Sequence, residues 1–393
     1  MKNTGDVLDG NSNVVIVGAG IGGLVCALAL QQAGISCTIY EADTHFTSPG
    51  AGIVLSVNAM RVFDALGLTE QIKQQGRIIK QFSMASPGGR ILSCHDLQSV
   101  SVQCNSCSIA IHRQALHTIL VNALNPGVIV FNKRCNNVDI EHKRCMFSDG
   151  DTVEYDILIG CDGVSSQVRQ AIGSLNPTRD ANQICYRGVT TLTGSSYNKH
   201  QFLEIWGRGK RFGFVNIGGD TMYWYATLRK DHYSNIEAHN SKSTLMAIFA
   251  QWQLPVPRIL DTQHSGTILR NDLYDRAPEG IWYKDSVVLI GDAIHPTTPN
   301  LGQGAGMAIE SAWVLVESLC ISTSIEKGFL RYQTLRAPRT TRITQQSRML
   351  GKVGNLNSPM SCFLRNLAIG ITPNWATNRY AEKIMRYCVV NKE

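Results

Sequence analysis

The stretch VVIVGAGIGG, residues 14–23, decides the fold of this chain. Its first four residues are all β-branched, which is typical of a buried parallel strand. Gly18, Gly20 and Gly23 then form a G-x-G-x-x-G pattern where a helix should begin. In such a turn the first glycine permits the tight bend, the second lets backbone approach a pyrophosphate, and the third lets the helix pack on the strand. We therefore expect a dinucleotide-binding turn, with an ordinary glycine-rich turn as the alternative.

The residues that follow complete a βαβ unit. A helical stretch over 24–32 ends at Gly34, a suitable C-terminal cap, and residues 37–40 read as the next strand. Glu41 lies at the end of that strand, where an acidic side chain can hold ribose hydroxyls. Ala42 is assigned to the same cofactor site. The pyrophosphate would lie at the helix N-terminus, because free N–H groups and the helix dipole favour anions there.

The rest of the chain predicts an α/β protein in which a Rossmann-like domain is interrupted by an antiparallel sheet. Strand patterns return at 128–131, 156–159 and 286–290, whereas 183–228 alternates and is rich in aromatics. Gly218 and Gly219 supply a hairpin turn in that middle region. The expected division is a nucleotide-binding domain of 1–75, 100–182 and 270–355, a sheet domain of 76–99 and 183–269, and a C-terminal helical segment of 356–393.

Composition limits the class of protein. The chain has 393 residues, 44% hydrophobic and 17% charged, with a net charge of +7, so disorder is excluded and no nucleic-acid partner is expected. Four arginines late in the chain are expected on a solvated helix face, or else on an anion-binding or partner surface: Arg336, Arg339, Arg342 and Arg348.

Cysteine usage and hydropathy favour a cytoplasmic protein. Twelve cysteines show no disulfide framework, and the single Cys-x-x-Cys of Cys104 and Cys107 has no second pair, so no metal site is expected. The apolar stretch 14–30 is broken by glycines and is too short to span a membrane. A strand and a helix explain it better, and no transmembrane segment is expected.

Two later motifs identify the family. They are GCDGVSSQVR at 160–169 and GDAIHP at 291–296, the second followed by TTPNLGQGAG at 297–306. With the first glycine turn they give a chain that resembles the class A flavoprotein monooxygenases, the family of para-hydroxybenzoate and salicylate hydroxylases. The resemblance runs from about Val14 to Leu350 and is specific for the family, much less so for the substrate.

The resemblance implies FAD as the cofactor and assigns residues to it. Asp162 and Gly163 would serve the FAD and NAD(P)H pyrophosphates, Asp292 the ribityl or pyrophosphate region, and Arg113 would contact FAD. The start of the helix after 301 would face the pyrimidine end of the flavin, where its dipole stabilises negative charge. The residues assigned to that end are Pro299, Gly302, Gln303, Gly304, Ala305 and Gly306.

Alternatives stay open for three side chains near these motifs. Asp162 could cap a turn, and Arg113 could form a surface ion pair. His295 could hold a structural hydrogen bond or contact the active site.

The activity implied by the resemblance is NAD(P)H-dependent hydroxylation of a small aromatic or heteroaromatic compound through a flavin hydroperoxide. The chain has one G-x-G-x-x-G and therefore no second dinucleotide-binding domain, so NADH or NADPH would bind only transiently, as a co-substrate with O2. A monomer or a homodimer is expected. An epoxidase or natural-product-modifying monooxygenase of the same family, and a non-oxygenating flavin reductase, are alternative functions.

The substrate-binding residues follow from two branches of the family. Residues 207–225 resemble the urate hydroxylases and the zeaxanthin-epoxidase-like proteins, which places Arg211 and Tyr223 at substrate-contacting positions. Urate hydroxylases carry an acidic residue where this chain has Asn300, which argues against urate. A solvated hairpin arginine and a core tyrosine are the alternatives for Arg211 and Tyr223.

The C-terminal segment carries an apolar helix face around Phe363 and Leu367. That face could dock on the rest of the protein or make peripheral contact with a membrane.

Overall fold

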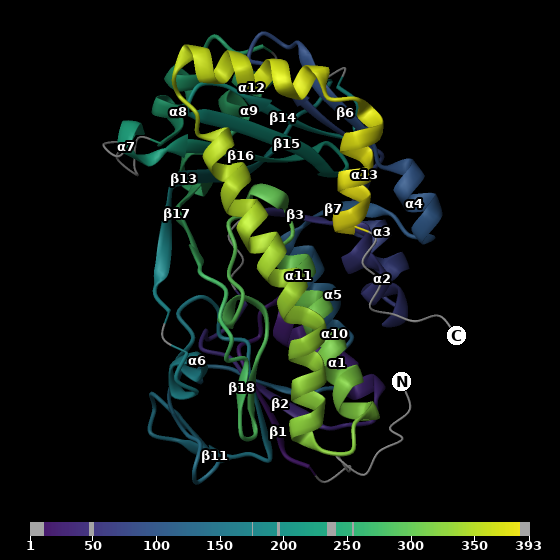
Figure 1. Ribbon diagram of the computed structural model, residues 1–393, viewed down its shortest axis with the longest axis vertical. Helices are drawn as coiled ribbons and strands as arrows, with labels where there is room; N and C mark the ends of the chain where they lie inside the picture. The colour runs from purple at the N-terminus through teal and green to yellow at the C-terminus, as the bar shows by residue number, and fades with distance from the viewer. Residues whose placement is uncertain are drawn as a thin grey trace.

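The structure is a computed structural model that describes residues 12–46, 51–174, 176–194, 197–233, 241–253 and 255–385. Figure 1 shows two stacked parts, with a mostly parallel sheet and its helices at the bottom and a broad antiparallel sheet at the top. The long helix α11 (Ile325–Gly354) runs from the lower part to the upper one. This arrangement confirms the α/β fold class with an inserted antiparallel sheet and C-terminal helices.

The lower part is built on a six-stranded sheet in the order β18-β19-β12-β1-β2-β8. Its centre is parallel: Val14 pairs with Cys37 on one side and with Ile157 on the other. The central strand is fully apolar and buried, as a parallel strand covered on both faces must be. The strands are β1 (Val14–Val17), β2 (Cys37–Tyr40), β8 (Ile129–Val130), β12 (Ile157–Gly160), β18 (Tyr283–Lys284) and β19 (Val287–Leu289).

Helices and two small sheets complete the lower part. One three-stranded sheet consists of β9 (Cys135–Asp139), β10 (Arg144–Phe147) and β11 (Thr152–Glu154), and the other of β3 (Gly52–Leu55), β4 (Arg77–Ile79) and β7 (Ser108–His112). The helices of this part are α1 (Ile21–Gln32), α2 (Val57–Ala65), α3 (Thr69–Gln75), α4 (Gln98–Cys104), α5 (Arg113–Asn122), α6 (Gln167–Ala171) and α10 (Gly304–Ile321). Short 3-10 turns lie at η3 (Gly291–Ala293) and η4 (Pro299–Leu301).

The upper part is a seven-stranded sheet in the order β17-β13-β16-β15-β14-β5-β6. Its strands are β5 (Gln81–Ala85), β6 (Ile91–Asp96), β13 (Thr178–Thr191), β14 (Gln201–Trp206), β15 (Lys210–Gly218), β16 (Thr221–Arg229) and β17 (Leu269–Arg276). The connecting helices are α7 (Lys230–Tyr233), α8 (Ser241–Phe249), α9 (Val256–Thr262) and η2 (Ser265–Thr267). The hairpin turn between β15 and β16 holds Gly218 and Gly219 at positive φ.

The two faces of this sheet have different partners. On β16, Met222 and Trp224 belong to the core that includes residues of α8 and α9. Tyr223 and Tyr225 alternate with them and therefore face the opposite side, toward the lower part. The sheet thus has one core face and one face available to a ligand; we call the second the ligand face.

A buried ion pair joins α10 to α11. Glu310 is fully buried and lies 2.7 Å from Arg336, itself fully buried, and 2.8 Å from Arg339. Asn58 of α2 donates a further hydrogen bond to the Glu310 carboxylate at 2.5 Å. Arg348 pairs instead with Asp275 of β17 at 2.8 Å.

The prediction of a solvated arginine face on α11 is therefore wrong for three of the four arginines. The pairing acids come from α10 and β17, far away in the sequence, and the local pattern does not contain them. Only Arg342 is exposed as expected.

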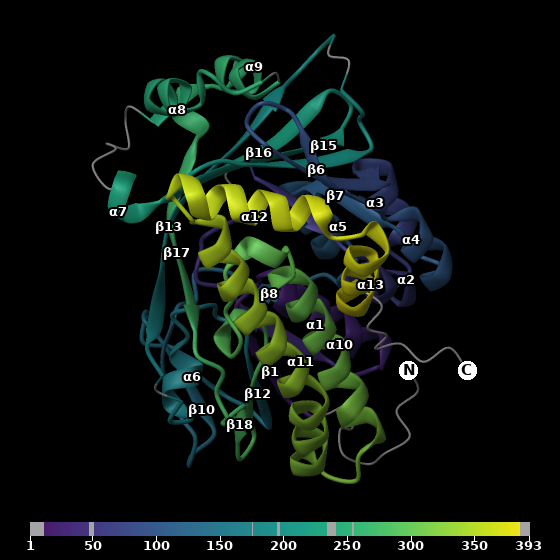
Figure 2. The same cartoon turned by 45° about the horizontal axis from the view of Figure 1, so that its top comes forward.

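The C-terminal segment forms α12 (Pro359–Ile371) and α13 (Asn374–Met385). Figure 2 shows α12 lying across the upper part, with α13 turning down beside it. Within the described ranges, only α10 has the length and hydropathy of a membrane span, and 78% of that stretch is buried inside the protein.

We predict that Glu310→Gln lowers the free energy of unfolding by about 3–5 kcal/mol, because it leaves two buried guanidinium groups without their counter-charge. Thermal and urea unfolding of the apoprotein measure this effect. Glu317→Gln, a half-buried position on the same helix, is the matched control and should change stability by less than about 1 kcal/mol. Equal effects of the two substitutions would contradict this account of the ion pair.

Candidate active site

The turn between β1 and α1 requires two of its glycines. Gly18 has φ +100°, and a Cβ there would lie 2.6 Å from the carbonyl oxygen of Cys161. A Cβ on Gly23 would lie 2.1 Å from the carbonyl oxygen of Gly18. Both contacts are impossible for any other residue, so the strand, the turn and the helix pack together only with glycine at these two positions.

Gly20 differs from its neighbours, because nothing lies within 4 Å of where its Cβ would be. Its φ is −67°, which any residue can adopt, and it is exposed. It is also the N-cap of α1 and provides no side-chain cap for the free N–H groups of that helix. The space beside Gly20 is therefore open exactly where a pyrophosphate would meet a helix N-terminus.

Glu41 holds the same turn from the end of β2. Its carboxylate accepts hydrogen bonds from the backbone N–H of Ala19 at 2.7 Å and of Asp43 at 2.9 Å. Ala42 follows it, half-buried. Contact of these two residues with a cofactor ribose stays a prediction.

Asp162 and Gly163 lie next to this turn at the end of β12. One Asp162 oxygen accepts hydrogen bonds from the backbone N–H of Gln167 at 2.8 Å and of Val168 at 3.2 Å, which caps α6. The other oxygen is buried and has no partner among the described residues. Burial raises the pKa of this carboxyl, while the hydrogen bonds oppose the rise. Asp162 therefore caps a turn and still offers one oxygen to a ligand.

Ala308 brings the first turn, Asp292 and the start of α10 together. Its methyl group lies 3.4 Å from the Cβ position of Gly22 on α1 and equally close to that of Gly291 in η3. Larger side chains at either glycine would push these segments apart. The N-termini of α1 and α10 are consequently held on the same side of the sheet.

Asp292 and Arg113 form the charged centre of this side. Both side chains are exposed, although the surrounding chain encloses Asp292 and raises the pKa of its carboxyl, and the positive charge of Arg113 opposes that rise. Arg187 of β13 and Tyr223 of β16 are also close enough to Arg113 to act on it electrostatically. The lower and upper parts thus contribute charged and phenolic groups to one location.

Side-chain hydrogen bonds fix the position of the start of α10. Pro299–Leu301 forms a short 3-10 turn, and Gly302 follows at φ +62°. Gln303, which is buried, donates a hydrogen bond to Ser56 at 3.1 Å and accepts one from Asn58 at 3.2 Å. The Gln303 side chain therefore anchors the turn, and Gly304, Ala305 and Gly306 present the first backbone N–H groups of α10.

These features fit an extended dinucleotide with an anionic end at each of two helix N-termini. The open position at Gly20 leaves room for a pyrophosphate, and the unpartnered oxygen of Asp162 lies beside it. The start of α10 offers a second positive helix end. Within the described ranges, no cluster of three or more His, Cys, Asp and Glu residues could hold a metal ion.

Arg211 of β15 is buried on the ligand face, with 2% of its surface exposed. It donates hydrogen bonds to Thr227 at 3.1 Å, to Glu204 at 3.4 Å and to the side-chain oxygen of Asn300. It is therefore not a solvated hairpin arginine. All three guanidinium nitrogens already have partners, which argues against a free charge for a substrate.

Asn300 is equally well bonded. Its amide nitrogen lies within hydrogen-bond distance of Gln183 at 3.3 Å, of Thr298 at 2.8 Å and of the carbonyl of Ser347 at 3.1 Å. Arg211 and Asn300 thus join the ligand face to η4, just before α10. Their catalytic role stays a prediction.

Tyr223 and Tyr225 lie side by side on the ligand face, with ring centroids 6.2 Å apart. The Tyr223 ring fills the space above Gly52, and the Tyr225 ring covers Gly213. Burial raises the pKa of both phenols. Both therefore remain protonated at neutral pH and can donate hydrogen bonds.

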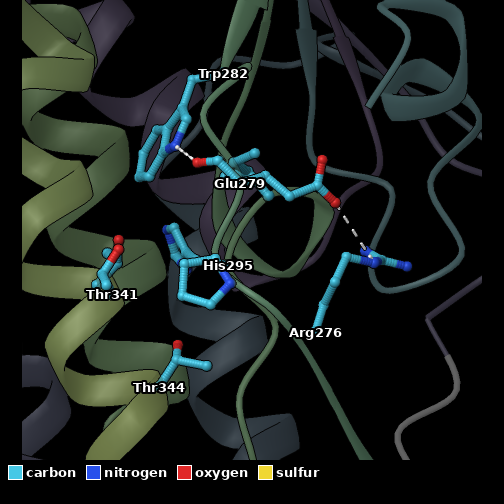
Figure 3. A pocket seen from close by; sticks show the side chains of 9 residues that line it. Arg276, Glu279, Trp282, His295, Thr341 and Thr344 are labelled. Carbon is cyan, nitrogen blue, oxygen red and sulfur yellow. Dashed lines mark hydrogen bonds and ion pairs between the residues drawn. The ribbon is translucent and has the colours of Figure 1, made fainter. Parts of the chain in front are cut away.

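His295 lies in a separate small cavity, shown in Figure 3. One ring nitrogen is hydrogen-bonded to Ser311 at 2.9 Å, and the other is buried without a partner among the described residues. The ring centroid lies 5.7 Å from that of Trp282. The open space of about 10 Å³ has room for about one water molecule. Burial and the charge of Arg336 lower the pKa of His295 to about 3, so it stays neutral. These contacts favour the structural role over contact with a substrate.

Two functional side chains were not predicted from the sequence. Glu204 neutralises Arg211, and Glu310 positions α10. Glu204 is a single charged residue among the apolar residues of β14, which is a signal in the sequence, but only its pairing with Gly213 places it on the ligand face. Nothing local distinguishes Glu310 from a solvated helix residue.

Comparisons with known proteins agree with this geometry. The sequence model of a family described as FAD binding domain matches residues 11–347. The chain is 30% identical over 354 residues to aurachin C monooxygenase/isomerase of Stigmatella aurantiaca, covering 90% of this chain and 92% of that protein. It is also 30% identical over 378 residues to 2-heptyl-3-hydroxy-4(1H)-quinolone synthase of Pseudomonas aeruginosa UCBPP-PA14, covering 94% and 97%.

Among solved structures, Klebsiella pneumoniae HpxO complexed with FAD and uric acid superposes with a TM-score of 0.89. It is 22% identical and covers 96% of this chain and 97% of its own. At that identity the likeness supports the fold.

The fold and site define an FAD-binding flavoprotein with an added sheet for a second ligand. The chain belongs to the FAD binding domain family and is a FAD-dependent monooxygenase of the aromatic and heteroaromatic hydroxylase type. NAD(P)H and O2 are the co-substrates of such enzymes.

We predict that Gly20→Ala weakens FAD binding by at least about tenfold, because the added methyl occupies the space of the pyrophosphate. The backbone there accepts alanine, so the thermal midpoint of the apoprotein should not fall. Gly266→Ala is the matched control, since its Cβ would also meet nothing within 4 Å and it lies in the sheet domain. Titration of apoprotein with FAD measures both, and unchanged affinity in Gly20→Ala would contradict the assignment.

Proposed function

We propose that this enzyme hydroxylates a ring carbon of a neutral, planar, fused heteroaromatic compound of the quinolone kind. Two of the relatives with 30% identity over at least nine-tenths of this chain support the proposal, since one of them is named as a quinolone synthase. The observation that carries it is the internal neutralisation of charge on the ligand face. Arg211 is paired with Glu204 inside the protein, so a substrate needs no countercharge at that position.

The ligand face supports a flat, apolar ring system. Tyr225 lies 6.2 Å from both Tyr223 and Phe202 in ring-centroid distance, and Val215 is part of the same surface. Aromatic rings bind planar ligands through offset or edge contacts. The protonated phenol of Tyr223 can donate a hydrogen bond to a ring carbonyl oxygen, and we propose that it orients the substrate.

Each part of the protein has its own task in the reaction. Bound FAD supplies hydride acceptance from NADH or NADPH and activation of oxygen. The first backbone N–H groups of α10 would stabilise negative charge on a flavin bound at that helix end. The Arg211–Asn300 contact fixes the distance between the ligand face and that helix end. The apolar rings exclude water, which protects the coupling of oxygen use to product formation.

Anionic heteroaromatic substrates are a second candidate, supported by a different pair of residues. Burial and, after it, the positive charge of Arg187 lower the pKa of Arg113, and Tyr223 lies near both arginines. Two guanidinium groups beside a phenol would suit a purine-like anion such as urate. Asn300 lacks the acidic group that urate hydroxylases use, which places this candidate second. Epoxidation, other natural-product modification and a non-oxygenating reductase are further outcomes of the test below.

We propose that the enzyme works in the cytoplasm. The described cysteines are all free thiols, as a reducing compartment maintains them.

The proposal predicts that a 2-alkyl-4-quinolone accelerates NAD(P)H oxidation and O2 uptake by the FAD-loaded enzyme, with little hydrogen peroxide released. Urate and a polyene, tested in parallel, should stimulate less and release more peroxide. Product mass increased by one oxygen confirms hydroxylation. Stimulation by urate alone would favour the anionic candidate, and NAD(P)H oxidation without any oxygenated product would favour a reductase.

We also predict that Tyr223→Phe lowers kcat/KM for the accepted substrate by about tenfold, because one hydrogen bond to the ring oxygen is lost. FAD content and thermal midpoint should stay as in the wild type. Tyr283→Phe, a half-buried tyrosine of β18, serves as the matched control. If Tyr223→Phe retains full kcat/KM, Tyr223 does not orient the substrate.

A further inference from the structure

Helix α12 presents its apolar face to solvent. Helical geometry places five large apolar side chains within an arc of about 100° on one side of the helix. Their exposed fractions are 67% for Met360, 63% for Phe363, 54% for Leu364, 47% for Leu367 and 69% for Ile371. A surface helix of a water-soluble protein normally turns such a stripe toward the core. We call these five residues the α12 stripe.

The opposite side of α12 carries the two buried residues of the helix, Cys362 and Arg365, and holds it to the protein. Arg365 is buried, donates a hydrogen bond to the carbonyl of Gly207 at 3.1 Å and lies 5.3 Å from the ring centroid of Trp206. Ser358 caps the first turn by accepting from the N–H of Ser361 at 3.2 Å. The helix cannot turn its stripe inward without losing the contacts of Arg365 with Gly207 and Trp206. Its outward orientation is therefore built into the fold.

Neighbouring residues extend the apolar surface. Trp375, 70% exposed, is the second residue of α13, the helix that follows the stripe. Ile91 of β6, the strand along which α12 packs, is 51% exposed. Figure 1 shows α12 on the outside of the upper part, away from the sheet that carries the first glycine turn. Tryptophan at the end of an apolar helix face is typical of a membrane–water interface.

The charge of this region indicates what covers the stripe. From Lys327 to Ala381 the sequence contains nine Lys and Arg residues and no Asp or Glu. Arg336, Arg339 and Arg348 are neutralised by Glu310 and Asp275. Exposed Lys352 and Arg379 flank α12 in the sequence, and exposed Arg208 hydrogen-bonds to the carbonyl of Asn357 just before α12. A second copy of the chain, docked stripe to stripe, would bring positive charge against positive charge. An anionic lipid surface would attract it.

We propose that the α12 stripe and Trp375 dock the enzyme on the surface of an anionic phospholipid membrane, with α12 lying in the interface plane. This orientation places the substrate-binding sheet toward the lipid and leaves the glycine turn of the lower part toward water. A lipophilic substrate could then enter from the membrane while NAD(P)H arrives from solution. Docking itself does not depend on the identity of the substrate.

Co-sedimentation of the FAD-loaded enzyme with vesicles tests the proposal. Wild type should bind vesicles of equal phosphatidylglycerol and phosphatidylcholine, bind pure phosphatidylcholine much less, and dissociate as salt is raised. Phe363→Ser combined with Leu367→Ser should lower the partition coefficient by at least about tenfold, because two apolar side chains no longer insert.

Val102→Ser combined with Leu330→Ser is the matched control. Both residues are exposed apolar side chains, 81% and 52%, on α4 and α11, outside the α12 stripe. The control should bind vesicles like the wild type. FAD content and NAD(P)H oxidation of all variants, measured without vesicles, separate loss of docking from loss of the enzyme's own function.

Three results would overturn the proposal. Wild type could fail to sediment with anionic vesicles, or the α12 variant could bind as well as the wild type. Light scattering could also show a wild-type dimer that the α12 substitutions convert to a monomer, in which case a second copy covers the stripe.

Discussion

The structure depends on the close approach of three chain segments around the methyl group of Ala308. That methyl fits between Gly22 of α1 and Gly291 of η3, with 3.4 Å to each Cβ position. With nothing bulkier at either glycine, α1, η3 and α10 pack closely, so that two helix N-termini and the turn that carries Asp292 lie on one side of the parallel sheet. An extended cofactor with an anionic group near each end can meet both termini at once. The Glu310–Arg336 pair behind α10 keeps this geometry rigid.

The second constraint is polar and connects the two parts of the molecule. Arg211 reaches from the ligand face to Asn300 in the turn before α10, and Glu204 balances its charge. Buried charges are costly unless they are paired and hydrogen-bonded, and here each donor has an acceptor. Side chains thus fix the ligand face and the start of α10 relative to one another. The surface that would meet the substrate is aromatic and largely uncharged.

The sequence predicts the features whose physical cause is local. Gly18 and Gly23 are recognisable because the turn tolerates nothing larger, and Tyr223 and Tyr225 share a face because strand side chains alternate. Pairings across long sequence separations are not readable in this way. The arginines of α11 looked solvated because Glu310 and Asp275 lie far from them in the chain. The outward stripe of α12 is similar: its amphipathic pattern was visible, but only Arg365 binding at Gly207 and Trp206 reveals which face meets the protein.

Comparison of FAD with FMN binding to the apoprotein tests the central claim most directly. If the cofactor extends from the turn at Gly20 to the start of α10, one FAD binds per chain, and FMN, which lacks the half that reaches Glu41, binds at least about a hundredfold more weakly. Equal affinity for the two flavins, or folded protein that takes up neither, would show that the glycine turn does not hold the cofactor.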